Sequence, residues 1–321
     1  MKENPFSCNK QDVNQYLPAK FTFFGYASFE TRSMTIPLSI AKERIARAVV
    51  FYSKGYDNSE AKMRIKNKLD NLPKFKELDL TNPISIARSL TNIVKGLFAD
   101  DTPFSLVVDI TAFTHETLLM FVKLILNNME KFESVQFLYN GAEGYSINTP
   151  LAEAWLSKGC KDVRNVIGFP GLIRPSAKTC LVLLAGFELE RATKLIEWLE
   201  PDRIALGYAF EPTSDNHVEL MNHFKNEFGK WQNNYMNNNV STFEFSSKDV
   251  LKTVNVLKEL IDRNQNDNYI IAPLNTKLST LATAIIALQH SKIQICYSIP
   301  EIYNVEGYST PSQNITVFRV D

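Results

Sequence analysis

The chain has 321 residues, 45% of them hydrophobic, which excludes wholesale disorder and allows two domains of ordinary size or one large one. Its 35 Lys and Arg residues balance 35 Asp and Glu residues, and this neutrality disfavours binding to long nucleic acids, which requires a basic excess. Four cysteines without a CxxC pair, and no apolar run of membrane length, predict a soluble cytoplasmic chain with reduced thiols and no membrane partner.

Residues 1–18 are polar and mixed, and we expect a flexible lead-in there. After them, buried strand patterns alternate with helical patterns, which is typical of parallel β-α-β crossovers and of a sheet covered on both faces. The predicted strands are 21–26, 48–52, 76–80, 105–110 and 135–139, and the predicted helices are about 32–42, 59–71, 83–98 and 115–129.

The second half repeats this order after a connector at about 149–178, whose Gly and Pro residues favour a stiff crossover between the halves. Its predicted strands are 181–186, 204–208, 242–245, 269–274 and 293–297, and its predicted helices are about 187–199, 216–232, 247–263 and a last one ending at His290.

We therefore predict an α/β fold of two tandem Rossmann-like units with mostly parallel sheets, related by internal duplication and packed as a pseudo-twofold pair. The predicted boundaries are 1–18 for the lead-in, 19–148 for the first unit, 149–178 for the connector and 179–321 for the second unit.

Four residue patterns recur at one spacing of roughly 160 residues, which is far longer than a solenoid period. The alternative is two unrelated Rossmann-like domains, whose patterns agree because all such units look alike. The paired patterns are Ser28-Phe29-Glu30-x-Arg32 with Gly186-Phe187-Glu188-x-x-Arg191, Asp109-Ile110-Thr111-x-x-Thr114 with Leu274-Asn275-Thr276-x-x-Ser279, Phe137-Leu138-Tyr139 with Ile295-Cys296-Tyr297, and Gly144-Tyr145-Ser146 with Gly307-Tyr308-Ser309.

Ligands of open α/β sheets bind outside the carboxyl ends of the strands, near a switch in strand order. That rule predicts the binding residues of each half, and both groups would face one shared cleft if the units pack as a pair. The predicted ligand-binding residues are Ser28, Glu30, Arg32, Lys54, Asp109, Thr111 and Thr114 in the first half, and Glu188, Arg191, Asn275, Thr276 and Lys277 in the second.

The segment from Asp109 to Thr114 places an acid and hydroxyls between a strand end and a helix start, where a phosphate or a ribose hydroxyl binds readily. The alternative is simple helix capping by Thr111 or Thr114. Lys277 adds a cation beside the matching helix start and could hold a phosphate, or could be a surface lysine after a capping Thr276.

Glu30 with Arg32, and Glu188 with Arg191, sit at the first strand-helix junction of each half. They favour an interior salt-bridge network over catalysis, and an Arg could also pair with Asp109. The chain has no GxGxxG, P-loop or GxSxG motif, and its histidine spacing does not suggest a metal, so no cofactor and no metal site are expected.

The layout resembles the CARF and SAVED ligand-sensing domains of antiviral systems, which also fuse Rossmann-like units with a strand-end motif. Asn275-Thr276-Lys277 matches part of that hydroxyl- and lysine-containing motif, and Asp109-Ile110-Thr111 matches less of it; both lack its paired glycines. The resemblance covers most of the chain as architecture, and it implies a cleft that binds cyclic oligonucleotides.

Three functions stay open. The first is a sensor of a nucleotide or phosphorylated small molecule, which would act through a protein partner or self-assembly because the two repeats leave no room for an effector domain. The second is a hydrolase, transferase or phosphodiesterase acting on a nucleotide, with Glu30, Asp109, Glu188 and Lys277 as its candidate catalytic residues. The third is a structural subunit of a complex, since the fold alone does not choose a function.

Overall fold

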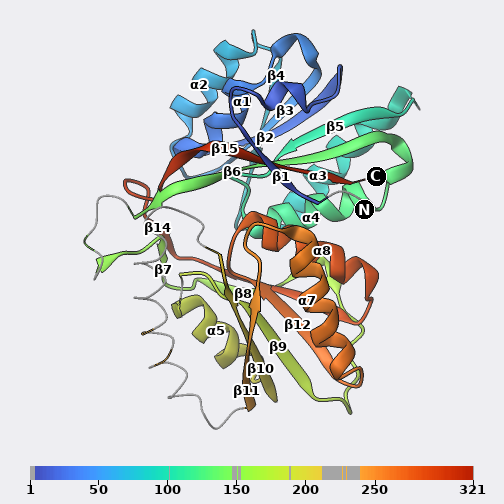
Figure 1. Cartoon of the computed structure of the whole chain (residues 1–321), viewed down its shortest axis with the longest axis vertical. Helices are drawn as coiled ribbons and strands as arrows, with labels where there is room; N and C mark the ends of the chain where they lie inside the picture. Colours follow the sequence, from blue (N-terminus) through green and yellow to red (C-terminus); the bar gives the residue numbers. More distant parts are fainter. Residues whose placement is uncertain are drawn as a thin grey trace. The chain divides into compact units, whose positions relative to one another are not determined.

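The structure, a computed structural model, describes residues 4–100, 102–146, 150, 153–187, 189–211, 226, 229 and 239–320. The chain divides into two compact units, each of which is an α/β body with its own sheet (Figure 1). The first unit comprises Met1–Glu143 and Ser309–Asp321, and the second comprises Gly144–Tyr308.

A seven-stranded sheet forms the first unit, in the order β1-β15-β6-β5-β2-β3-β4. Its strands are β1 (Phe6–Asn9), β2 (Phe21–Ala27), β3 (Ile45–Ser53), β4 (Pro73–Leu78), β5 (Phe104–Asp109), β6 (Phe132–Tyr145) and β15 (Ser309–Val320). The strands β2 to β6 pair in parallel, whereas β1 is antiparallel to β15. All seven residues of β2 are buried, as expected of a central strand covered by helices on both faces.

Four α-helices belong to the first unit. α1 (Thr35–Ser39) contacts α2 (Ser59–Lys68), and α3 (Pro83–Leu97) contacts α4 (His115–Leu126). Right-handed crossovers place the first pair on one face of the sheet and the second pair on the other (Figure 1). Short 3-10 turns complete the unit at η1 (Val13–Gln15), η2 (Thr31–Met34), η3 (Lys42–Arg44), η4 (Phe98–Asp100) and η5 (Met129–Lys131).

A six-stranded sheet forms the second unit, in the order β11-β10-β9-β12-β13-β8. Its strands are β8 (Asp162–Pro170), β9 (Thr179–Leu184), β10 (Arg203–Ala209), β11 (Asn239–Phe245), β12 (Asn268–Pro273) and β13 (Ile293–Ile299). Its helices are α5 (Leu189–Leu199), α7 (Val250–Arg263) and α8 (Lys277–Gln289), and the short β7 (Ser157–Lys158) pairs with β14 (Ile302–Tyr303). No helix among the described residues is long and apolar enough to cross a membrane.

The two sheets share one strand order. The first sheet reads β4-β3-β2-β5-β6-β15 and the second reads β11-β10-β9-β12-β13-β8. β8 runs antiparallel to β13. β15 also runs antiparallel to β6, because Asn140 contacts Ser312 and Asn314 while Ser146 bonds to Tyr308. The predicted α/β fold with two mostly parallel sheets is confirmed. The shared order is the common one for Rossmann-like folds, so it fits both an internal duplication and two unrelated domains.

The predicted boundaries differ from this division in three places. The flexible lead-in is wrong for Phe6–Asn9, because β1 pairs with β15. The predicted connector contains β8, a strand of the second sheet, and the last strand of the chain belongs to the first sheet. The strands β1 and β8 lie at sheet edges, and β15 lies between β1 and β6. Their partners lie far along the chain or their burial is irregular, so their local patterns do not reveal them.

Of the predicted helices, one differs from the structure and another lies almost wholly outside the described residues. The predicted helix at 32–42 is instead the turn η2 followed by the short α1, which ends at Ser39. The predicted helix at 216–232 lies almost wholly outside the described residues.

The switch in strand order lies between β2 and β5 in the first sheet, and between β9 and β12 in the second. In the second unit the chain itself fills this position. A Cβ on Gly186 would lie 1.9 Å from the carbonyl oxygen of Leu274, and the Asn275 amide donates to the carbonyl of Ala185 at 2.6 Å. The segments after β9 and β12 therefore touch at these residues.

We expect Gly186→Ala to destabilise the chain by about 2 kcal/mol or more, because the added methyl group must displace backbone and not a flexible side chain. Gly96→Ala is the matched control: no atom lies within 4 Å of its Cβ position, and alanine in a helix gains about 0.5–1 kcal/mol over glycine. Urea unfolding of both variants measures the difference. If Gly186→Ala and Gly96→Ala unfold at the same urea concentration, the segments after β9 and β12 do not touch at Gly186.

Candidate functional site

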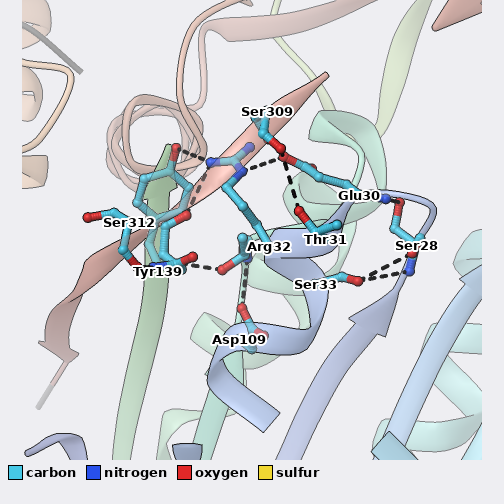
Figure 2. Close-up of polar contacts among 11 residues, drawn as sticks. Ser28, Glu30, Thr31, Arg32, Ser33, Asp109, Tyr139, Ser309 and Ser312 are labelled. Carbon is cyan, nitrogen blue, oxygen red and sulfur yellow. Dashed lines mark hydrogen bonds and ion pairs between the residues drawn. The ribbon is translucent and has the colours of Figure 1, made fainter. Parts of the chain in front are cut away.

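Four of the polar residues predicted for the first half lie together at the carboxyl edge of the first sheet: Ser28, Glu30, Arg32 and Asp109 (Figure 2). Glu30 precedes η2 and Arg32 lies within it, and both side chains are buried. The Arg32 Nε donates to Glu30 Oε1, and that same oxygen accepts the Ser309 hydroxyl at 2.6 Å. The predicted pairing of Glu30 with Arg32 is therefore confirmed, and β15 supplies a second donor to the carboxylate.

Arg32 also reaches β6. Its guanidinium donates to the carbonyl of Asn140 at 3.1 Å and to the Tyr139 hydroxyl at 3.4 Å. Because β5 lies between β2 and β6, an arginine that follows β2 and contacts β6 must cross the carboxyl end of β5. The last residue of β5 is Asp109, which Arg32 therefore helps to bury.

The second unit repeats this arrangement with Arg191, which is also buried. Its Nε donates to the carbonyl of Ser298 at 2.8 Å, and its guanidinium carbon lies 5.2 Å from the centre of the Tyr297 ring. The corresponding distance from Arg32 to the Tyr139 ring is 5.9 Å. Each arginine thus packs on a tyrosine, in β6 or in β13, and bonds to the backbone carbonyl of the next residue. The arginine and tyrosine positions of two predicted correspondences therefore match in the structure.

Asp109 and Thr111 join β5 to β6. The Thr111 N–H donates to Asp109 Oδ1 at 3.0 Å, and the Thr111 hydroxyl accepts the N–H of Asn140 at 3.0 Å. Thr111 therefore ties two strands together and does not cap α4. The capping residue is Thr114, whose hydroxyl accepts the N–H of Thr117 at 3.2 Å.

Two buried oxygens in this cluster have no hydrogen-bond partner. Asp109 is 1% exposed and Asn140 is fully buried, yet Asp109 Oδ2 and Asn140 Oδ1 accept no donor. The Asn140 amide nitrogen is occupied, because it donates to the carbonyls of Ser312 and Asn314. Leu138 is opposite Asp109, so Asn140, two residues further on, shares its face of the sheet. The edge thus holds two adjacent acceptors without donors.

Burial raises the pKa of Asp109 to about 7, against the opposing hydrogen bonds from Thr111 and the charge of Arg32. Near neutral pH the carboxyl group therefore populates both its protonated and its ionised form. A titratable group shifted into this range, placed at the switch of a parallel sheet, marks a candidate functional residue.

The other predicted residues of the first half have local roles. The Ser28 hydroxyl accepts the N–H of Glu30 at 3.3 Å. Lys54 follows β3 with an exposed side chain, while its backbone N–H donates to Leu78. Ligand binding by these side chains stays a prediction.

In the second unit, the side chains of Asn275 and Thr276 make hydrogen bonds within the protein. Thr276 caps α8 by accepting the N–H of Ser279 at 3.3 Å, and its hydroxyl donates to the carbonyl of Ser247 at 2.7 Å. Thr276 is therefore the counterpart of the capping Thr114, and the predicted pairing with Thr111 is wrong by three residues. Lys277 is the first residue of α8 and is half-buried. Glu188 lies outside the described residues.

Sequence reasoning missed the contribution of β15. Ser309 donates to Glu30, and the carbonyls of Ser312 and Asn314 hold Asn140. The recurrence of Gly307-Tyr308-Ser309 was the one signal that could have pointed to it. Among the described residues, no three His, Cys, Asp or Glu side chains are grouped as a metal site requires.

No protein-family model matches the chain, and no curated protein matches its sequence. The function must therefore be argued from the site alone.

We expect Asp109 to contribute a loss of stability as the pH rises from about 4 to about 7, because its carboxyl group keeps its proton in the folded chain and releases it in the unfolded chain. A rise from the usual 3.8 to about 7 corresponds to about 4 kcal/mol at most. Asp109→Asn removes this titration. Urea unfolding of the two proteins across this range measures the difference, and parallel pH profiles would contradict the assignment.

We expect Arg32→Ala to destabilise the chain by about 3–5 kcal/mol, because it leaves the Glu30 carboxylate buried without its cation. Adding Glu30→Gln should recover part of the loss, since the buried charge is then gone. The control is Arg64→Ala, which removes an exposed ion pair with Glu60 and should cost less than about 0.5 kcal/mol. A small loss for Arg32→Ala would mean that solvent reaches the cluster.

Proposed function

We propose that this chain binds a small phosphorylated ligand of the nucleotide class at the carboxyl edge of its first sheet, and that it works as a sensor. The observation that carries this proposal is the Asp109 carboxyl group, which lies at the switch in strand order with one oxygen that accepts no hydrogen bond. When the carboxyl group is ionised, this oxygen is a buried acceptor without a donor, which costs stability, so its retention favours a ligand that supplies the donor.

A ribose hydroxyl fits this requirement. It would donate to Asp109 Oδ2 or Asn140 Oδ1, the two unpartnered acceptors on one face of the sheet. The N-cap of α4, Thr114, lies five residues after Asp109, and a helix N-terminus favours an anion such as a phosphate. Both atoms are buried in the structure, so binding requires the segment around Glu30 and Arg32 to move.

The two units contribute unequally. In the second unit, Gly186, Leu274 and Asn275 fill the corresponding switch, and Thr276 is used for capping and for bonding to Ser247. We therefore place the ligand on the first unit and assign the second unit to signal transfer.

Two fused Rossmann-like units also resemble the CARF and SAVED sensing domains, and this likeness extends the proposal to cyclic oligonucleotides and to a role in antiviral defence. A sensor of this kind acts through a protein partner or by self-assembly.

An enzyme is the second candidate, and the pKa of Asp109 favours it. A carboxyl group with a pKa of about 7 can both give and take a proton at neutral pH, as general acid-base catalysis requires. Among the other residues proposed for catalysis, Glu30 is already paired with Arg32 and Ser309, and Lys277 belongs to the second unit.

We expect thermal unfolding and calorimetry to detect a ligand in a panel of ribonucleoside 5′-monophosphates, their 3′,5′-cyclic forms, small cyclic oligonucleotides and ribose 5-phosphate. Asp109→Asn replaces an acceptor by a donor, and should weaken binding by roughly ten- to a hundredfold, which corresponds to about 1–3 kcal/mol. Asp262→Asn, an exposed acid on α7, is the matched control and should bind like the unaltered chain.

Chromatography of each mixture distinguishes the two candidates. Unchanged ligand supports the sensor, and product that Asp109→Asn fails to make supports the enzyme. Both fail if no compound raises the melting temperature and none is converted, or if Asp109→Asn leaves binding and turnover unchanged.

A further inference from the structure

The loop between β3 and α2, residues 53–58, is held in one shape by hydrogen bonds. The Tyr26 hydroxyl bonds to the Ser53 hydroxyl at 2.7 Å, and the Asn58 amide nitrogen donates to the carbonyls of Ser53 and Tyr56 at 2.9 and 2.8 Å. Gly55 turns the chain with φ of +87°, a conformation that glycine adopts without strain. The loop is therefore built to present its side chains in a fixed arrangement.

Tyr56 of this loop meets Phe29, which follows β2. Their ring centres lie 5.6 Å apart at an angle of 39°, and both rings are partly exposed. β2 and β3 are neighbours, with Ala27 opposite Tyr52, so the two rings stand at the same carboxyl edge as Asp109. By contrast, the rings of Phe51, Phe113 and Phe121 are fully buried in the core of this unit.

The side-chain oxygen of Asn58 accepts no hydrogen bond. It is the N-cap of α2, yet its side chain makes no capping hydrogen bond. The N–H of Ser59, the first residue of α2, donates to Asp57. Asn58 is 5% exposed, and its Oδ1 has no partner. Since its amide nitrogen is bound inside the loop, the oxygen is the only hydrogen-bonding atom of this side chain left for another molecule.

The charges around the loop favour a neutral group over a phosphate. Lys54 and Asp57 are both exposed and opposite in sign, and the Asp57 carboxylate is already bonded to the Ser59 hydroxyl and N–H. The loop thus presents a partly exposed ring pair, and a buried acceptor two residues after Tyr56. A planar heterocycle with an N–H or amino donor matches both features, since every nucleobase has a π face that stacks on aromatic side chains.

We propose that Phe29 and Tyr56 form a stacking wall for the aromatic base of the ligand, with Asn58 Oδ1 accepting a hydrogen bond from the base. This inference rests on the proposed function, and it adds what that function leaves open: the ligand is recognised by its base as well as by its sugar and phosphate.

Calorimetry with the four ribonucleoside 5′-monophosphates and with ribose 5-phosphate tests the wall. We expect at least one mononucleotide to bind about tenfold or more tightly than ribose 5-phosphate. Tyr56→Leu and Phe29→Leu should each remove about tenfold of that advantage and leave ribose 5-phosphate binding unchanged, and Tyr56→Phe should restore it, because the ring is retained.

Tyr16→Leu is the matched control, since Tyr16 forms another partly exposed ring pair, with Phe6, near β1. It should lose a similar amount of stability with no change in nucleotide affinity. The wall is overturned if ribose 5-phosphate binds as tightly as every mononucleotide, or if both leucine variants keep the base advantage; the proposed function survives either result. If no compound binds, the proposed function itself fails.

Discussion

In each unit a buried arginine crosses the carboxyl end of a central strand, which is β5 in the first unit and β12 in the second. Arg32 follows β2 and bonds to β6, and Arg191 follows β9 and bonds to β13. A guanidinium suits this place because it stacks on a tyrosine ring while its fixed N–H groups meet a backbone carbonyl. The interaction joins β2 to β6 and β9 to β13 at the carboxyl edge of each sheet, where most ligands of such folds bind.

The same contact has different consequences in the two copies. In the first unit it covers an acid, Asp109, and so creates a buried carboxyl group whose pKa is raised to about 7. In the second unit, the segments after β9 and β12 touch through Gly186, Leu274 and Asn275. The first unit thus has a buried acid at its switch in strand order, whereas the second unit has a close backbone contact there.

The last strand links the first site to the rest of the chain. β15 follows the second unit in sequence, but it lies in the first sheet, where Ser309 bonds to Glu30 and the carbonyls of Ser312 and Asn314 hold Asn140. Any movement of the segment around Glu30 therefore changes contacts with a strand that is covalently continuous with the second unit. This connection gives the proposed sensor a physical route for its signal.

The sequence by itself determined the fold class, the order of the parallel strands and helices along the chain, and the residues at the strand ends. Those features are local: apolar runs such as 21–26 and 105–110 report burial directly, and the Arg32 and Arg191 patterns recur at a fixed spacing. The pairing partners of β1, β8 and β15, and the burial and hydrogen bonding of the candidate site, emerge from the tertiary structure alone. The pairing of β15 with β6, the burial of Asp109 beneath Arg32, and the contacts of Asn140 with β15 all arise between segments distant in sequence. Hydrogen bonding and desolvation depend on those distant neighbours, which no local pattern encodes.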